Sequence, residues 1–252
     1  MLAVKDVSKS YGDHEVLNKL SLNIEKGKIT SFVGANGAGK STLLSIMARL
    51  LRSTEGEVLL DGEPIKDIKD IEMAKRVAIL KQSNNLSIRL TIRDLVSLGR
   101  FPHSRGRLTP ADIAAVDRSI QYLDLADIQH KYLDQVSGGQ RQRAFIAMVV
   151  SQETDYVLLD EPLNNLDIKN SVHIMKTLRK LVDEMGKTVV LVIHDINFAS
   201  AYSDNIVAMK NGKVIRSGCA CEMIEAANLK EIFDIECDVF DAGDCRLCNY
   251  FI

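Results

Sequence analysis

A glycine-rich stretch that ends in lysine and serine is the strongest chemical signal in this sequence. It fits the pattern G-x-x-x-x-G-K-[ST] and is followed by a threonine: Gly34, Ala35, Asn36, Gly37, Ala38, Gly39, Lys40, Ser41 and Thr42. Glycines allow backbone amides to turn towards phosphate oxygens, and a helix start adds the positive end of its dipole. We expect Lys40 to bridge the β- and γ-phosphates of a nucleoside triphosphate and the Ser41 hydroxyl to bind Mg²⁺.

The segments on either side of this loop distinguish a nucleotide site from a glycine-rich turn without a ligand. Residues 29–33 form a short apolar run that is typical of a central strand. Residues 40–51 carry apolar side chains at the spacing of a helix that packs on a sheet. Strand, loop and helix follow in the order that phosphate binding requires, which favours nucleotide binding.

Two adjacent acids at the end of a second apolar run add the catalytic chemistry. Residues 156–159 are wholly apolar and lead into Asp160 and Glu161. Beside a phosphate loop, we expect Asp160 to bind the metal and Glu161 to act as general base for the attacking water. By itself such a pair is more often a solvated strand end. A triphosphate needs a cation to offset its charge, and this favours the catalytic interpretation.

The elements that must position these residues alternate between strands and helices. The first 35 residues predict antiparallel strands, and residues 56–65 predict a hairpin. The runs at 156–159 and 189–193 suit strands buried on both faces of a parallel sheet, with a helix between them. Helical spacing prevails over residues 90–148. The fold class is therefore α/β.

A third motif resembles that of a known family. Residues 135–143 read QVSGGQRQR and contain Ser137, Gly138, Gly139 and Gln140. This stretch is similar to the signature sequence of ATP-binding cassette (ABC) ATPases, and small residues at a helix start can offer a hydroxyl and amides to an anion. The resemblance covers nearly the whole chain. It implies a P-loop NTPase of ABC type, with a mixed sheet core, an N-terminal antiparallel β part and a helical lobe that carries the signature.

The resemblance also implies roles for isolated residues. Tyr11 matches the aromatic residue that stacks on adenine, and Gln82 matches the glutamine that approaches Mg²⁺ and the attacking water. His194 matches the histidine that contacts the γ-phosphate, and Asp167 matches the loop that reaches towards a second subunit. Without the family pattern, Tyr11 is more often a core residue and His194 a structural one.

The resemblance also implies an organisation and a set of partners. We expect a single ABC ATPase domain over residues 1–252, with a catalytic core at 1–88 and 149–252 and a helical lobe at 89–148. Two such subunits close around ATP, so a homodimer is expected. Separate membrane permeases and an extracytoplasmic substrate-binding protein complete an importer, which places this chain at the cytoplasmic face of the inner membrane. The departures Val136 and Leu163 from the family pattern leave the catalytic groups unaltered.

Two segments resemble the subfamily that serves ferric-siderophore, haem and cobalamin importers. They are residues 98–103, which read LGRFPH, and residues 161–167, which read EPLNNLD. We expect ATP hydrolysis to drive uptake of a ferric siderophore. The alternatives are haem, cobalamin or another metal substrate, a cassette that acts on nucleic acid or the ribosome, and a catalytically silent module. Residues 89–107 are locally basic, and their arginines face either the membrane subunit or solvent: Arg89, Arg93, Arg100, Arg105 and Arg107.

Composition excludes several other classes of protein. Of the 252 residues 46% are hydrophobic, which allows a sizeable core, and a net charge of −2 argues against a general nucleic-acid binder. The longest apolar run, residues 144–150, is too short to span a bilayer, and the first residues do not resemble a secretion signal. All five cysteines lie in the last 34 residues, and we expect free thiols there rather than a zinc or redox site.

Overall fold

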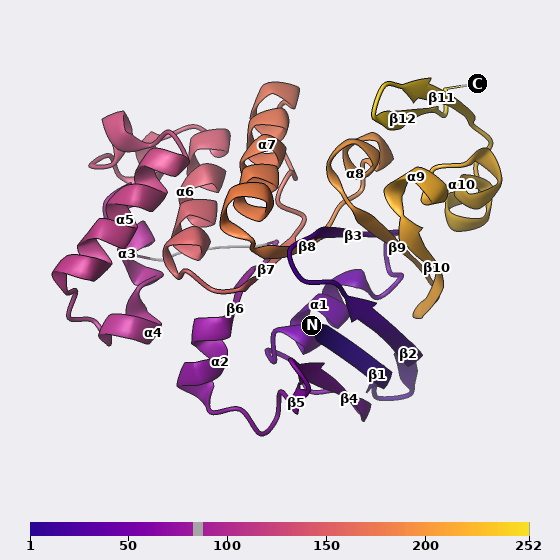
Figure 1. The fold of residues 1–252 in the computed structure, drawn as a ribbon, viewed down its shortest axis with the longest axis horizontal. Helices are drawn as coiled ribbons and strands as arrows, with labels where there is room; N and C mark the ends of the chain where they lie inside the picture. Colours follow the sequence, from indigo (N-terminus) through magenta and orange to yellow (C-terminus); the bar gives the residue numbers. More distant parts are fainter. Residues whose placement is uncertain (83–87, 252) are drawn as a thin grey trace.

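The computed structural model describes residues 1–82 and 88–251, which form three sheets and the helices around them (Figure 1). The strands are β1 (Leu2–Tyr11), β2 (His14–Ile24), β3 (Ile29–Val33), β4 (Glu55–Leu60), β5 (Glu63–Pro64), β6 (Val77–Leu80), β7 (Tyr156–Asp160), β8 (Thr188–Val192), β9 (Asn205–Lys210), β10 (Lys213–Cys219), β11 (Asp238–Ala242) and β12 (Cys245–Asn249). The helices are α1 (Lys40–Met47), α2 (Asp70–Arg76), α3 (Ile92–Leu98), α4 (Phe101–Ser104), α5 (Pro110–Tyr122), α6 (Gly138–Ser151), α7 (Ile168–Met185), α8 (Ile196–Tyr202), α9 (Ala220–Met223) and α10 (Ala226–Phe233).

A six-stranded sheet forms the centre, in the order β10-β9-β3-β8-β7-β6. The neighbours from β9 to β6 pair in parallel, and only β10 is antiparallel. Side chains alternate between two cores: Leu158 and Val190 enter the core on the side of α1, whereas Val157 and Leu191 enter the core on the other face. Apolar residues at every position are what a strand covered on both faces requires, so the parallel-sheet prediction is confirmed.

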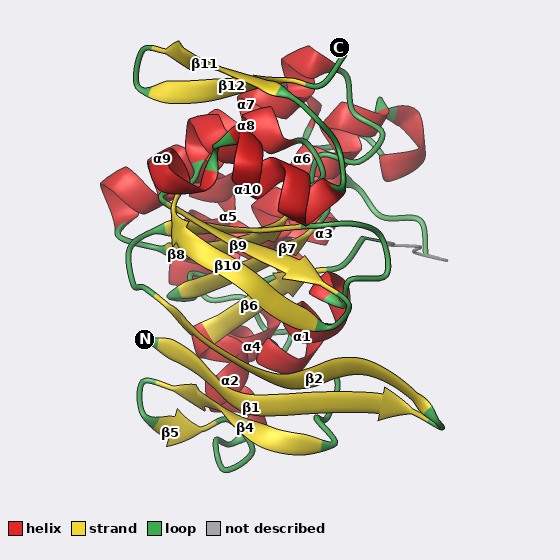
Figure 2. Ribbon diagram, turned by 90° about the vertical axis from the view of Figure 1, so that its right-hand side faces the viewer, coloured by secondary structure: helices red, strands yellow, loops and turns green. Residues whose placement is uncertain are grey.

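The molecule is layered, as Figure 2 shows. The antiparallel sheet β2-β1-β4-β5 lies below the central sheet, with α1 between them, and helices cover the upper face. The β11–β12 hairpin lies at the top of this view and packs on α8, where Ser200 Oγ donates to the carbonyl of Arg246 at 2.6 Å. The expected hairpin at residues 56–65 is present as β4 and β5. The expected α/β class with an antiparallel β part is therefore confirmed.

The first helix after the phosphate loop ends earlier than expected. It was predicted over residues 40–51, but α1 ends at Met47 and Arg49 adopts a left-handed conformation with φ of +57°. The Arg49 guanidinium donates to the carbonyls of Ile65 (2.8 Å) and Ile68, which join β5 to α2. This long-range contact, which sequence periodicity does not report, holds Arg49 in place just after the end of α1.

Helices α3 to α6 lie together on the left of Figure 1, and α6 continues to Ser151. At their centre Arg100 is only 5% exposed. Its guanidinium donates to Asp112 (2.9 Å), to the carbonyl of Ser151 (2.7 Å) and to Glu153 (2.8 Å). The Thr109 amide and hydroxyl, followed by Arg100, lower the pKa of Asp112 to about 2. Arg100 therefore holds this group of helices together and faces neither solvent nor a membrane subunit.

The cysteines depart from the expectation of five thiols. Cys219 and Cys221 form a disulfide, because β10 ends at Cys219 and the turn into α9 brings the two Cα atoms to 5.4 Å, within bridging range. Cys237 and Cys248 remain buried thiols, and Cys245 is half-buried. Burial and then the neighbouring Cys237 raise the pKa of Cys248, which disfavours its thiolate form.

Each helix within residues 1–82 and 88–251 is too short or too polar to cross a bilayer.

Replacing Arg100 by alanine should destabilise the protein strongly. It leaves the buried carboxylate of Asp112 without its cation, and breaking a buried ion pair in this way costs about 3–5 kcal/mol. Urea unfolding at pH 7 measures the change in the free energy of unfolding. Arg107→Ala, at an exposed position, is the matched control, and an equal effect of the two substitutions would contradict the role given to Arg100.

Candidate functional site

The phosphate loop connects the carboxyl end of β3 to α1, and its glycines have identifiable tasks. Gly34 has φ of +136°, and a Cβ there would lie 2.1 Å from the carbonyl oxygen of Met209. Gly39 has φ of +96°, and a Cβ would meet Leu17 Cδ2 at 2.5 Å. Among the described residues no side chain caps α1, so its first-turn N–H groups are available to a ligand. The loop is thus shaped to bring backbone amides close to an anion.

Lys40 lies across this loop. Its Nζ donates to the carbonyls of Gly34 (2.7 Å) and Ala35 (2.9 Å), and the side chain is buried. Burial lowers the pKa of Lys40, while the carboxylates of Glu161 and Asp160 oppose that shift. The ammonium group is therefore held in place beside two acids, at the position where a phosphate chain would meet it.

The acid pair follows β7, and its first member is bound to the phosphate loop. Ser41 Oγ donates to Asp160 Oδ1 at 2.7 Å, and Asp160 is buried. Burial raises the pKa of Asp160, the Ser41 hydrogen bond opposes this, and the charge of Glu161 adds to it. A hydroxyl and a carboxylate side by side are hard oxygen donors of the kind that Mg²⁺ prefers, and a cation would offset the buried negative charge. The donor set fits magnesium.

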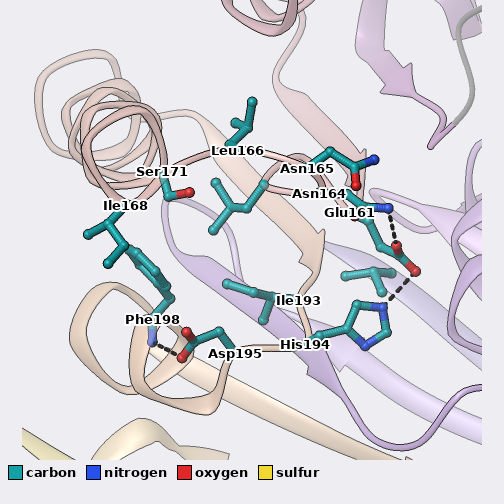
Figure 3. A pocket seen from close by; sticks show the side chains of 12 residues that line it. Glu161, Asn164, Asn165, Leu166, Ile168, Ser171, Ile193, His194, Asp195 and Phe198 are labelled. Atoms are coloured by element: carbon teal, nitrogen blue, oxygen red, sulfur yellow. Dashed lines mark hydrogen bonds and ion pairs between the residues drawn. The ribbon is translucent and has the colours of Figure 1, made fainter. Parts of the chain in front are cut away.

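The second member, Glu161, is held between residues from the two neighbouring strands. Gln82 follows β6 and donates through Nε2 to Oε2 at 2.6 Å. His194 follows β8, and its Nε2 lies 2.7 Å from Oε1, as Figure 3 shows. The side chain of Glu161 is 13% exposed, against 45% for His194. The described contacts of Gln82 are with Glu161 and not with the expected metal ligands Ser41 and Asp160.

Asn164 is a residue of this site that sequence reasoning did not identify. Its Nδ2 donates to Glu161 Oε2 at 3.3 Å, and its backbone N–H donates to the Glu161 carbonyl. The signal was present, because an amide three residues after Glu161 closes a turn onto it.

A cavity of about 300 Å³ lies beside Glu161 and His194, between residues 163–168 and α8 (Figure 3). Leu166, Ile193 and Phe198 contribute apolar side chains to its wall. The lining includes Glu161 but no residue of the loop 34–42, so the cavity adjoins the carboxylate rather than the glycine-rich loop.

No described contact joins Tyr11, Ser137 or Asp167 to this cluster. Tyr11 ends β1, is 52% exposed, and has Lys9 Nζ 5.1 Å from its ring centroid. Ser137 caps α6, where its Oγ accepts from the Gln140 amide at 3.3 Å. Asp167 caps α7. No described contact joins these caps to the phosphate loop of the same chain.

This chain is similar to proteins of known function. The profile of the family described as ABC transporter matches residues 17–164. The chain is 57% identical to the Petrobactin import ATP-binding protein YclP of Bacillus subtilis, with 100% of each chain covered. It is 45% identical to the Petrobactin import ATP-binding protein FatE of Bacillus anthracis, over 95% of this chain and 96% of that relative. It is 39% identical to the Iron(3+)-hydroxamate import ATP-binding protein FhuC of Bacillus subtilis, over 94% and 89%.

Solved structures also match. The dimeric structure of the cassette MJ0796 is 34% identical with a TM-score of 0.78, over 87% of this chain and 99% of that one. A post-hydrolysis dimer of the same cassette, bound to ADP and Pi, matches with the same identity, TM-score and coverage.

Two glycines of the phosphate loop allow a matched test of its shape. The Cβ added by Gly37→Ala meets no atom within 4 Å, so this variant loses only the cost of a left-handed alanine, about 1–2 kcal/mol. Gly39→Ala has a similar backbone cost and also forces Leu17 aside, so we expect it to lower the free energy of unfolding more. Thermal unfolding without added nucleotide measures both variants, and equal melting temperatures would contradict this packing.

Proposed function

The chain belongs to the ABC transporter family, and we propose that it drives an importer whose cargo is an iron chelate of the ferric-siderophore class. As an ATP-binding cassette it binds and hydrolyses ATP. The observation that carries the catalytic proposal is the placement of Glu161 between Gln82 and His194 at adjacent strand ends, next to the loop that holds Lys40.

The geometry supports a division of labour among these residues. The loop 34–42 binds the phosphate chain through its amides, and Lys40 exchanges its two carbonyl acceptors for phosphate oxygens. Glu161 accepts a proton from the attacking water, while Gln82 and His194 orient its two oxygens. His194 is exposed enough to reach the γ-phosphate, and Tyr11 offers an exposed ring for adenine.

Magnesium is the metal that we propose for this site. Ser41 and Asp160 would hold it, and Gln82 lies close enough to Glu161 to contribute on rearrangement. Bound there, the ion offsets the charge of the transferring phosphoryl group.

A second copy of the chain is needed to complete the site. No described contact joins the caps at Ser137 and Asp167 to the phosphate loop of their own chain, and the similar cassette MJ0796 forms a dimer. We therefore infer a homodimer in which Ser137, Gly138, Gly139 and Gln140 of one chain face the ATP of the other. We also infer that the helices within residues 89–148 act as the lobe that carries the signature.

The cargo is inferred from the relatives. Two of those described above are named for import of petrobactin and the third for import of iron(3+)-hydroxamate, so petrobactin is the first ligand to test. The permeases are separate chains, an extracytoplasmic binding protein supplies the cargo, and the ATPase sits at the cytoplasmic face of the membrane. Uptake of haem or cobalamin is the competing assignment.

Replacing Glu161 by glutamine should abolish hydrolysis while sparing ATP binding. The amide keeps the shape of the side chain but cannot accept the proton, which costs about 10²- to 10⁴-fold in kcat. Phosphate release and nucleotide binding are measured on the same preparation, with the exposed Glu184→Gln as control. A variant that hydrolyses ATP at the normal rate would show that Glu161 is not the base.

Transport is tested in source cells that carry Glu161→Gln in place of the native protein. We expect uptake of iron-55 as ferric petrobactin to fall to background, while uptake of haem and labelled cobalamin continues. Selective loss of haem or cobalamin uptake instead would reassign the cargo. Unchanged uptake of all three, in cells deleted for related ATPases, would contradict the import proposal.

A further inference from the structure

Asn170 touches two parts of the site that are separate in the sequence. Its backbone amide and its side-chain Nδ2 both donate to Asp167 Oδ1, at 2.7 and 2.9 Å. Its Oδ1 accepts from Nη1 of Arg143 in α6 at 3.0 Å. The side chain therefore connects the loop 161–167 to α6, the helix that begins within the signature sequence.

The start of α7 differs from the starts of other helices in the chain. At α3, α5 and α6 the third residue returns its side chain to the backbone amide of the cap residue, which forms a capping box. Asn170 is the third residue of α7, but its carboxamide reaches the Asp167 side chain and then α6. The Asn170 side chain therefore joins two helices instead of closing a capping box.

The Asn170 carboxamide packs against Gly139. A Cβ at Gly139 would lie 2.4 Å from Asn170 Cγ and 2.6 Å from both Nδ2 and Oδ1. The adjacent Gly138 has nothing within 4 Å of such a Cβ. Only one of the two signature glycines is thus required by packing within the chain, and Asn170 is the reason.

We propose that Asn170 is a positioning residue, which fixes the signature end of α6 to the loop that carries Glu161 and Asp167. This inference rests on the function proposed above. The contact makes Ser137 and Asp167 of one chain a single surface for the second subunit. The chemistry of the neighbours sets the orientation of the amide, because a carboxylate only accepts and a guanidinium only donates hydrogen bonds. An aspartate at position 170 has the same shape but places two carboxylates together.

The test compares Asn170→Asp with Lys169→Ala, an exposed neighbour in the same helical turn. We expect Asn170→Asp to lower kcat about 10- to 100-fold, the cost of misplacing a group by about an ångström. Binding of a fluorescent ATP analogue to the phosphate loop should be unchanged, since Asn170 does not touch that loop. Lys169→Ala should keep the kcat of the native protein.

A double-mutant cycle provides the second measurement. Asn170→Ala and Arg143→Met each break the contact between the helices, so the double variant should be no slower than the worse single variant. Losses of kcat that multiply would show that the residues act separately and would overturn the proposal. Should Asn170→Ala fail to fold, Asn170→Asp decides alone because it preserves the size of the side chain.

Three further results would count against Asn170 as a positioning residue: a normal kcat in Asn170→Asp, an equal loss in Lys169→Ala, or a fall in nucleotide binding and melting temperature that matches the fall in kcat. Each of these results is distinct from failure of the proposed function, because that failure would mean that the native protein itself does not hydrolyse ATP.

Discussion

The parallel alignment of β3, β8, β7 and β6 is the constraint on which the site depends. Adjacent parallel strands end at the same edge of a sheet, so whatever follows them is brought together. The phosphate loop follows β3, His194 comes two residues after β8, Glu161 follows β7 and Gln82 comes two residues after β6. Glu161 follows the strand between the other two, and for that reason its two carboxylate oxygens can be held from opposite sides.

The two hydrophobic cores keep that edge in register. Because alternate side chains of β7 and β8 enter opposite cores, a slip of one residue would exchange every buried position and move Glu161 away from His194. The close approach of Gly34 to Met209 ties the loop to β9 as well. Packing thus fixes the strand ends and the loop with the precision that hydrogen-bonded catalytic groups need.

Motif and periodicity were enough to predict the central strands, the phosphate loop and the acid pair, because each is encoded within a few consecutive residues. Long-range contacts were not accessible in that way. Arg49, just after the early end of α1, bonds to a carbonyl beyond β5, and Arg100 is buried although Arg105 and Arg107 nearby in the sequence are exposed. Asn170 carries no motif at all, and its importance is apparent only when α6 and α7 are seen side by side.

The polar groups of the site are satisfied by one another: Lys40 by loop carbonyls, Ser41 by Asp160, and Glu161 by Gln82 and His194. A triphosphate must therefore displace existing hydrogen bonds, and it can do so because phosphate oxygens accept charge-assisted bonds that neutral carbonyls cannot match. A ligand shifts a conformational equilibrium only through interactions that differ between the two states, and these exchanged contacts are such interactions. Closure of two subunits around ATP would then draw its free energy from the same groups that perform hydrolysis.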